Sequence, residues 1–397
     1  MTRKQWYRRI LCMVLFVSII YTGYYAYNYI QISIPEKIHV VSSDDIEAVR
    51  FDFPACTDET LQNELGEYTI SMKLFGVLPI KDIAIEVISE TQVLTCGFPV
   101  GIYLETDGVL VVGTTTIEGK NGATFNPSYS VLQVGDYVLA VNGQEIDEKE
   151  ELVSFVENSE GKEMILTIRR NGQTSKISIT PEMDVDGEYK LGAWVRDDTQ
   201  GIGTLTYITS DGSFGALGHG VSDVDTGCIM DSDGGKLYEA EIISVVKGES
   251  GNPGGLSGLI RYSDRAELGT INENTAEGIF GKGNAELINK GYGEVMDIAL
   301  KQEVRKGEAY IRCTVDGEIK DYRIEITKIN TSDVSMNRGL EIKVVDEELL
   351  AITNGIVQGM SGSPIIQDGK LVGAVTHVLV NDPSKGYGIF IENMLEH

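Results

Sequence analysis

Hydrophobic and polar residues follow three successive patterns along this 397-residue chain. An apolar run from Ile10 to Ile20 comes directly after a basic N-terminal stretch. Alternating apolar and polar positions begin near Tyr68, and from residue 190 onward short alternating segments are separated by glycines. A period of two is typical of β-strands, whereas an uninterrupted apolar run is typical of a helix. The pattern therefore predicts one N-terminal helix followed by a mostly β chain.

The N-terminal run has the features of an exported segment. Basic residues stand between positions 3 and 9, and a cluster of tyrosines follows the run as far as Tyr27. A basic flank, an apolar stretch and an aromatic belt place the N-terminus in the cytoplasm, and the whole run is about long enough to span a bilayer. No small-x-small cleavage motif is evident. We therefore predict an uncleaved signal anchor, a transmembrane segment over residues 1–31, and a membrane-anchored or secreted, extracytoplasmic protein.

Residues 32–91 divide into two parts. Residues 32–65 are polar and mixed in charge, and we expect them to form an exposed, unstructured stalk. Residues 67–90 alternate on either side of a loop that holds Gly76 and Pro79, which predicts a small β-hairpin.

Residues 92–183 form the next predicted unit. Short strands flank a helix whose apolar stripe runs from Leu152 to Val156. Asn171 and Gly172 stand between two alternating runs, and this dipeptide is a strong signal for a hairpin turn.

One phrase in this unit is informative about its family. From Leu132 to Gly143 the chain reads Leu-Gln-Val-Gly-Asp-Tyr-Val-Leu-Ala-Val-Asn-Gly, which resembles PDZ domains of bacterial proteases. A glycine-containing loop in such a domain turns successive N–H groups toward a terminal carboxylate, and the adjacent strand edge accepts the peptide. The other interpretation is that the loop is only a turn in a regulatory domain. By analogy, the resemblance implies that the peptide-binding residues are Val100, Gly101 and Ile102.

Composition limits the remaining possibilities. Residues 184–397 are rich in glycine and in short strands, which favours a β-barrel or a β-sandwich. The formal net charge of −27 repels phosphate backbones, so nucleic acid is not an expected partner. Five cysteines without a Cys-x-x-Cys pair and only four histidines argue against a zinc site. We expect no metal and no cofactor.

The candidate chemistry lies in the stretch Gly359-Met360-Ser361-Gly362-Ser363-Pro364. A nucleophilic serine needs a tight, exposed turn and backbone N–H groups aimed at the developing oxyanion. We predict Ser361 as the nucleophile and the N–H groups of Gly359 and Ser361 as the oxyanion hole. Ser363 precedes a proline that restricts its backbone, and Ser257 lacks these surroundings. The stretch resembles the nucleophile region of chymotrypsin-like serine proteases, which implies a double β-barrel peptidase domain over residues 184–397.

A catalytic serine normally needs a histidine as its base. His39 lies in the predicted stalk, and His397 is the C-terminal residue. His219 stands in a glycine-flanked turn after a strand, and we predict it as the base. His377 lies within a strand and by analogy borders the substrate pocket. The third member should be a carboxylate, and spacing alone does not choose among Asp223, Asp225, Asp231 and Asp346.

Four motifs occur in one order, namely Gly201–Thr206, Leu217–Asp223, Gly359–Pro364 and Gly373–Pro383. Together with the preceding PDZ-like unit and the anchor, they resemble the stage IV sporulation protein B peptidases, peptidase family S55. The resemblance places the family's His-Asp-Ser triad on His219, Asp346 and Ser361. The other interpretation of Asp346 is an acid at the start of a short helix.

The resemblance also implies a function. Family members are exported from the forespore into the space between its two membranes, where they cleave themselves near the N-terminus. They also cut an extracytoplasmic protein of a membrane complex, which triggers intramembrane processing of a late sigma factor precursor. The implied partners are a protein substrate at a membrane surface, the chain's own N-terminal region and a peptide ligand of the PDZ domain. The alternatives are a non-catalytic PDZ scaffold and a quality-control protease of the HtrA type, although the latter places its PDZ domain after the protease domain.

Overall fold

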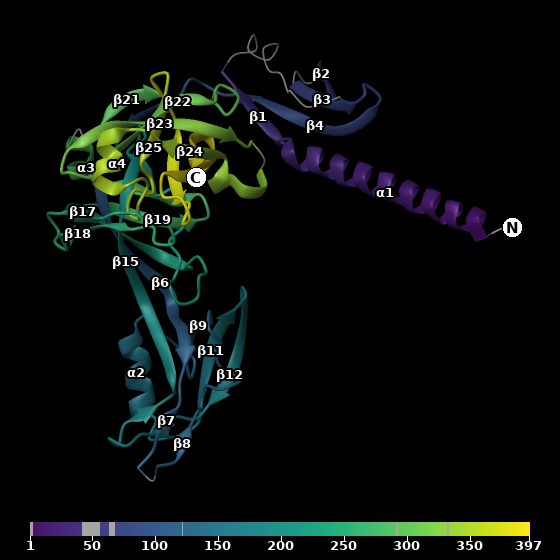
Figure 1. Cartoon of the computed structure of the whole chain (residues 1–397). Coiled ribbons are helices and arrows are strands. Elements are labelled where there is room, and N and C mark those ends of the chain that lie inside the picture. Colours follow the sequence, from purple (N-terminus) through teal and green to yellow (C-terminus); the bar gives the residue numbers. More distant parts are fainter. Residues whose placement is uncertain (1–2, 42–55, 63–67, 121, 291–292, 332) are drawn as a thin grey trace.

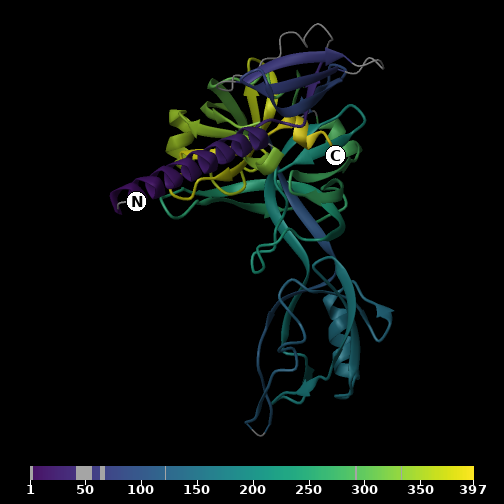
Figure 2. The same ribbon diagram turned by 90° about the vertical axis from the view of Figure 1, so that its right-hand side faces the viewer.

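The computed structural model describes residues 3–41, 56–62, 68–120, 122–290, 293–331 and 333–397. Figures 1 and 2 show an N-terminal helix that carries a small sheet, a body of two β-barrels, and a unit that projects away from the barrels. The protein is mostly β, as the alternating pattern predicts.

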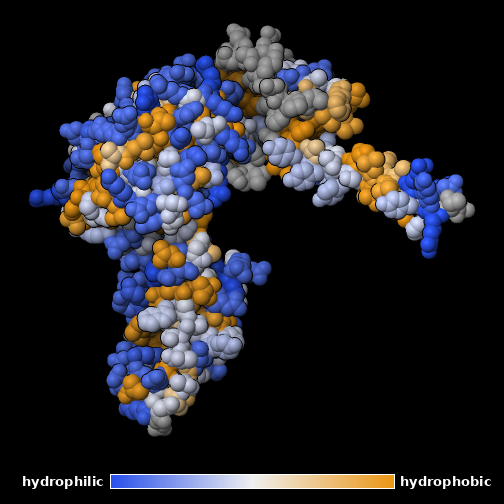
Figure 3. Space-filling model, viewed as in Figure 1, coloured by the Kyte–Doolittle hydropathy of each residue, from blue (hydrophilic) through white to orange (hydrophobic). Residues whose placement is uncertain are grey.

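The N-terminal helix α1 (Arg3–Ser33) projects away from the rest of the molecule. Its apolar side chains are exposed, and its basic residues gather at the free N-terminal end, which is blue in Figure 3. Residues Arg3–Ile32 are long and apolar enough to cross a membrane. The helix is therefore compatible with a membrane anchor or with a signal sequence.

A four-stranded sheet follows α1, in the order β1-β4-β3-β2. The alternation over residues 67–90 produces the antiparallel pair β3 and β4, although Pro79 lies within β4 and not in the loop. The expectation of an unstructured stalk over residues 32–65 is wrong for the described residues, because β1 and β2 are both paired; residues 42–55 and 63–65 lie outside the described part. The strands are β1 (Lys37–Val40), β2 (Cys56–Gln62), β3 (Tyr68–Leu74) and β4 (Leu78–Val87).

The first barrel is a ring of six strands in the order β6-β17-β19-β20-β16-β15, which the pairing of β15 with β6 closes. Its core is a cluster of aliphatic residues with Phe98 and Phe214. The strands of the ring are β6 (Pro99–Thr114), β15 (Ala193–Ile208), β16 (Ser213–Ala216), β17 (Ser232–Val246), β19 (Glu267–Thr275) and β20 (Gly278–Gly283). At its margins lie β5 (Gln92–Thr95), β18 (Gly255–Ile260), α3 (Ala285–Asn289) and β21 (Glu294–Asp297).

The projecting unit is built on the far halves of β6 and β15, which are long enough to belong to both bodies (Figure 1). Residues 99–106 of β6 pair with β15 and β17 in the barrel, whereas Val109 and Leu110 pair with β9 in the projecting unit. Residues 92–106 therefore lie with the peptidase barrel and not with the predicted unit 92–183. The other elements here are β9 (Tyr137–Val141), α2 (Lys149–Asn158), β11 (Met164–Arg170) and β12 (Gln173–Ile179).

The second barrel is closed in the order β22-β23-β24-β27-β26-β25 around its own apolar core. A further cluster that includes Tyr207, Phe280 and Ile389 joins the two barrels. The strands are β22 (Gly307–Thr314), β23 (Ile319–Ile329), β24 (Leu340–Val344), β25 (Pro364–Gln367), β26 (Lys370–Val378) and β27 (Lys385–Phe390). The short helices are η2 (Asp333–Arg338), α4 (Glu347–Thr353) and α5 (Ile391–Met394).

Candidate active site

A cavity of about 520 Å³ brings together parts of both barrels. The first barrel contributes His219, which follows β16, and the second contributes the loop that carries Ser361 and the strand β26 with His377. Two of the residues predicted as catalytic therefore share one cavity, although they stand 142 positions apart in the sequence (361 − 219).

The turn around Ser361 depends on glycines. Gly359 and Gly362 have φ angles of 95° and 92°, a region that side chains with a Cβ rarely adopt. A Cβ on Gly362 would also lie 2.1 Å from the carbonyl oxygen of Thr204. The chain can therefore turn sharply here and still pack closely against β15, which leaves the Ser361 side chain at the cavity wall.

Strand β15 holds this turn through two threonine hydroxyls. The hydroxyl of Thr204 donates to the carbonyl of Gly359 at 3.0 Å, and that of Thr206 donates to the carbonyl of Gly362 at 2.8 Å. The Thr204 N–H donates to the Ser361 carbonyl at 2.9 Å. In the sequence, these threonines stand out only as part of the motif Gly201–Thr206. Two threonines at alternate positions of a buried strand indicate that their hydroxyls need acceptors, but the pattern does not say that the acceptors lie in the Ser361 turn.

The predicted oxyanion hole consists of the backbone N–H groups on either side of Met360. The N–H of Met360 donates to the carbonyl of Val357 at 3.1 Å, and the Met360 side chain is fully buried in the second barrel. Among the described residues, the N–H groups of Gly359 and Ser361 donate to no backbone carbonyl. An oxyanion hole needs N–H groups that are free of such acceptors.

His219 is held in one tautomer by the backbone. Its Nδ1 lies 2.9 Å from the carbonyl oxygen of Gly220, and because a carbonyl only accepts, Nδ1 carries the proton. Nε2 is then the basic nitrogen. Burial lowers the pKa of His219, and the hydrogen bond to Gly220 opposes this shift only in part. Leu217 and Gly218 both adopt left-handed backbone angles just before it, so His219 follows a tight turn.

The ring of His377 lies beside that of His219 in the cavity. The two ring centroids are 4.7 Å apart, with an interplanar angle of 34°. Burial lowers the pKa of His377 to about 4, helped by the positive charges of His219 and Arg338. His377 Nδ1 is buried and has no hydrogen-bond partner among the described residues. A neutral imidazole therefore stands beside the predicted base and does not compete with it for a proton.

Asp346 is not brought to this cavity. It is the N-cap of α4, where its Oδ1 accepts the N–H groups of Glu348 and Leu349 at 3.0 and 3.1 Å. Its Oδ2 accepts the N–H of Arg323 at 3.2 Å. The carboxylate is thus occupied by backbone donors, and the expected contact with His219 is not formed. The interpretation of Asp346 as an acid at a helix start describes its surroundings.

The other candidate acids are also engaged elsewhere. Asp223 and Asp225 both pair with Arg196, and Asp231 lies 3.2 Å from Arg169. Within the described ranges, none of them forms a hydrogen bond or ion pair with His219. The carbonyl of Gly220 takes the orienting position that a carboxylate has in a Ser-His-Asp triad.

The predicted peptide-binding residues Val100, Gly101 and Ile102 lie in the first barrel, and this prediction is wrong. They form part of β6 and pair with β15 on one side and with β17 on the other. A Cβ on Gly101 would lie 2.3 Å from the side chain of Ile260. Because both strand edges are occupied, no peptide can be added here.

A different groove lies in the projecting unit, between α2 and the start of β15. It has a volume of about 480 Å³, and residues Ala193–Val195 form one wall. Val153 of α2 and Trp194 of β15 are 48% and 64% exposed, although both are large and apolar. Among the described strands, β15 pairs over Ala193–Arg196 with β6 alone, so its other edge is open toward α2. Gly192, at φ 68°, turns the chain into this strand.

The double barrel with a serine, a histidine and free N–H groups in one cavity defines a serine endopeptidase. A family model described as SpoIVB peptidase S55 matches residues 187–395, and a PDZ domain model matches residues 132–170. The chain belongs to the SpoIVB peptidase S55 family.

Individual relatives add little beyond the family. A putative zinc metalloprotease, LL2128 of Lactococcus lactis subsp. lactis, is 36% identical over 67 residues, which are 17% of this chain and 15% of that protein. The chain thus matches less than a sixth of the length of this relative.

Solved structures are similar only at low scores. The PDZ domain of the SdrC-like protein of Listeria monocytogenes has 19% identity and a TM-score of 0.19, and the match covers 22% of this chain and 87% of that one. The active form of the Rv3671c protease of M. tuberculosis has 16% identity and a TM-score of 0.24, with 50% and 74% covered. Such scores carry no argument about the site.

Proposed function

We propose that this chain is an autoproteolytic endopeptidase of sporulation signalling, with Ser361 as nucleophile and His219 as general base. The observation that carries the proposal is the shared cavity, which is lined by His219, Gly359 and Ser361, and the N–H groups of Gly359 and Ser361 donate to no backbone carbonyl among the described residues. A proteolytic serine needs these three elements together.

In the proposed reaction, Ser361 first turns its hydroxyl away from the carbonyl of Thr376 and toward His219. Nε2 of His219 accepts the hydroxyl proton as the oxygen attacks the scissile carbonyl carbon, while Nδ1–H stays on Gly220. The tetrahedral oxyanion accepts hydrogen bonds from Gly359 and Ser361. His219 then gives the proton to the leaving amine, and water hydrolyses the acyl-enzyme with the help of the same groups.

Asp346 has a supporting role in this proposal. It caps α4, and α4 ends six residues before Gly359 (359 − 353). A secure helix start fixes where the following loop leaves the helix, and so helps to place the nucleophile turn. The family's acid would then act through the position of Ser361 and not through contact with His219.

The proposed substrates follow from the family, and the proposed peptide site follows from the groove between α2 and β15. The substrates are the chain's own N-terminal region and an extracytoplasmic protein of a membrane complex that controls the processing of a late sigma factor precursor. The forespore intermembrane space is the proposed location. The groove between α2 and β15 is the proposed site for a peptide ligand, because it combines an open strand edge with apolar side chains.

Comparison of the wild-type chain with Ser361→Ala, expressed with their membranes and separated by size, tests the proposal. We expect the wild type to shorten itself and Ser361→Ala to remain at full length. Ser257→Ala is the matched control and should shorten like the wild type. Equal shortening of Ser361→Ala and the wild type would rule out Ser361 as the nucleophile and return the non-catalytic scaffold to favour.

A further inference from the structure

The segment Ile34–Val40, which joins the N-terminal helix to the rest of the chain, is bound like a peptide ligand. Its residues Lys37–Val40 form β1, which runs parallel to β4, with Lys37 opposite Ala84 and Val40 opposite Val87. The carbonyl of Glu36 accepts the Ala84 N–H at 3.0 Å. The main chain is therefore held in register by the strand edge that β4 presents.

Three aliphatic side chains of this segment pack into the apolar core of the small sheet. Ile34, Ile38 and Val40 are 1%, 7% and 1% exposed, and they share a core with residues of β3 and β4. At the same time, Lys81 Nζ donates to the carbonyl of Ile34 at 2.8 Å. Burial of these three aliphatic side chains contributes substantially to the free energy that holds so short a segment in place.

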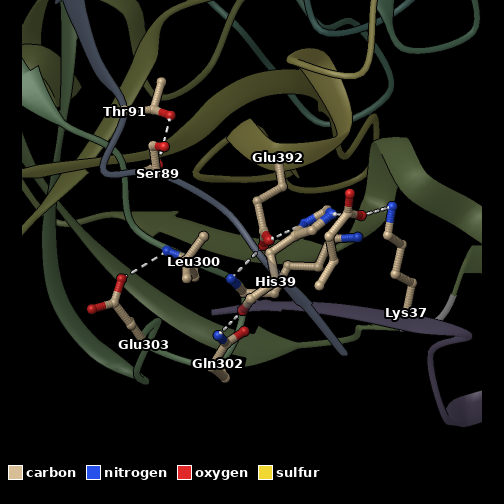
Figure 4. A network of polar contacts seen from close by, with 10 residues as sticks. Lys37, His39, Ser89, Thr91, Leu300, Gln302, Glu303 and Glu392 are labelled. Atoms are coloured by element: carbon tan, nitrogen blue, oxygen red, sulfur yellow. Dashed lines mark hydrogen bonds and ion pairs between the residues drawn. The ribbon is translucent and has the colours of Figure 1, made fainter. Parts of the chain in front are cut away.

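His39 points the other way, into the peptidase barrels (Figure 4). Its Nδ1 lies 2.9 Å from Oε1 of Glu392 in α5, whose side chain is 3% exposed. The other carboxylate oxygen of Glu392 accepts the N–H of Lys301 at 2.5 Å. Gln302 Nε2 donates to the His39 carbonyl at 2.5 Å. On its other side, His39 Nε2 lies 3.6 Å from Oε2 of Glu86 in β4, and Glu86 also pairs with Lys37.

These contacts show that the small sheet and the peptidase barrels together form one acceptor site. The sheet β2–β4 supplies the strand edge and the apolar pocket, while the peptidase supplies a buried carboxylate and an amide. A buried carboxylate that loses one of its two partners is left incompletely compensated, so departure of His39 is unfavourable.

We propose that residues 34–40 are a docking peptide and that the part from residue 56 onward carries its acceptor site. The ligand class is an extended peptide with aliphatic residues at its first, fifth and seventh positions and a histidine between the last two. A cut between residues 41 and 56 then leaves α1 attached to the peptidase without a covalent bond. Cleavage in this region and release from the anchor are therefore separate events, and this conclusion does not depend on which protease makes the cut.

The test uses the full chain with Ser361→Ala, in membranes, with the recognition sequence of a site-specific protease inserted after residue 48. After complete cutting and centrifugation, we expect the peptidase part to sediment with the membranes. Cutting in the presence of excess synthetic peptide 33–41 should move it to the supernatant. The same peptide with His39→Ala should be about tenfold or more weaker, because it leaves Glu392 without its donor.

Two full-chain variants sharpen the result. Glu392→Gln should weaken retention, whereas His397→Ala should not, although His397 also contacts two glutamates, Glu273 and Glu277. Release of the peptidase part on cutting without any peptide would overturn the proposal. So would equal potency of the two peptides, or retention that neither peptide affects.

Discussion

The hydroxyl of Ser361 donates to the carbonyl of Thr376 at a distance of 2.7 Å. No hydrogen bond joins this hydroxyl to His219 within the described residues, although both line the same cavity. Thr376 is itself fixed, because its hydroxyl donates to the carbonyl of Asn337 at 2.6 Å. Hydrogen bonds between catalytic groups often form fully only when substrate is bound. In the proposed reaction, a rotation of the Ser361 side chain toward His219 would be the first step.

Replacing Thr204 by valine should lower kcat without unfolding the protein. The change keeps the shape of the side chain but removes the hydroxyl that holds the Gly359 carbonyl. Displacement of the oxyanion hole by a fraction of an ångström should reduce kcat about 10- to 100-fold, with a smaller effect on KM. Steady-state kinetics on a peptide substrate would measure this. Thr209→Val is the control and should behave like the wild type, because among the described residues the Thr209 hydroxyl bonds only within its own turn.

Activity should persist on the acid side of the usual histidine range. Burial lowers the pKa of His219, so the ring stays neutral, and able to act as a base, below the ordinary value of about 6.5. His377 does not add a second titration near neutrality, because its pKa is lowered to about 4. The acid limb of kcat/KM against pH reports the pKa of the free enzyme's base. A midpoint at or above about 6.5 would contradict the dominant effect of burial.

Local signals allowed several features to be predicted from the sequence. Asn171 and Gly172 form the expected hairpin turn, with φ angles of 50° and 75°, because their conformational preference depends on few neighbours. The turns that carry Ser361 and His219 could be predicted for a similar reason, since glycines around each residue indicate a constrained turn.

The errors concern partners that are distant in the sequence. Val100, Gly101 and Ile102 were expected in a peptide-binding loop, but they form part of β6, and no local pattern says that this strand is long enough to run through both the barrel and the projecting unit. Asp346 has neighbours in sequence that are typical of a helix start, and its spacing from Ser361 says nothing about its distance from His219. His39 was placed in a stalk because its partner, Glu392, lies 353 residues away.

Asp346→Asn separates the two roles considered for this carboxylate. An asparagine can still cap α4, so the variant should keep most of the activity and lose about 1 kcal/mol of stability or less. A carboxylate acting as the third member of a triad would behave differently, with a loss of about 10⁴-fold in kcat on the same change. Asp346→Ala removes the cap and should cost about 1 kcal/mol. Kinetics together with urea unfolding of both variants would decide between the roles.

Val153→Glu should abolish peptide binding by the groove between α2 and β15. The side chain is 48% exposed, so the protein tolerates the change, but the new charge would face the apolar part of the groove. We expect affinity to fall at least about tenfold, as measured by fluorescence anisotropy with a set of C-terminal and internal peptides. Ile165→Glu is the matched control, because Ile165 is 49% exposed on β11 and does not line the groove.

Gly101→Ala provides the complementary test of where peptides bind. The added Cβ would collide with Ile260 in the first barrel, so the variant should unfold at lower urea concentration than the wild type. The peptide affinity of the molecules that remain folded should be unchanged, because Gly101 lies outside the groove. If Gly101→Ala weakened peptide binding while Val153→Glu did not, the groove would be misplaced and the strand around Val100 would have to open to accept peptides.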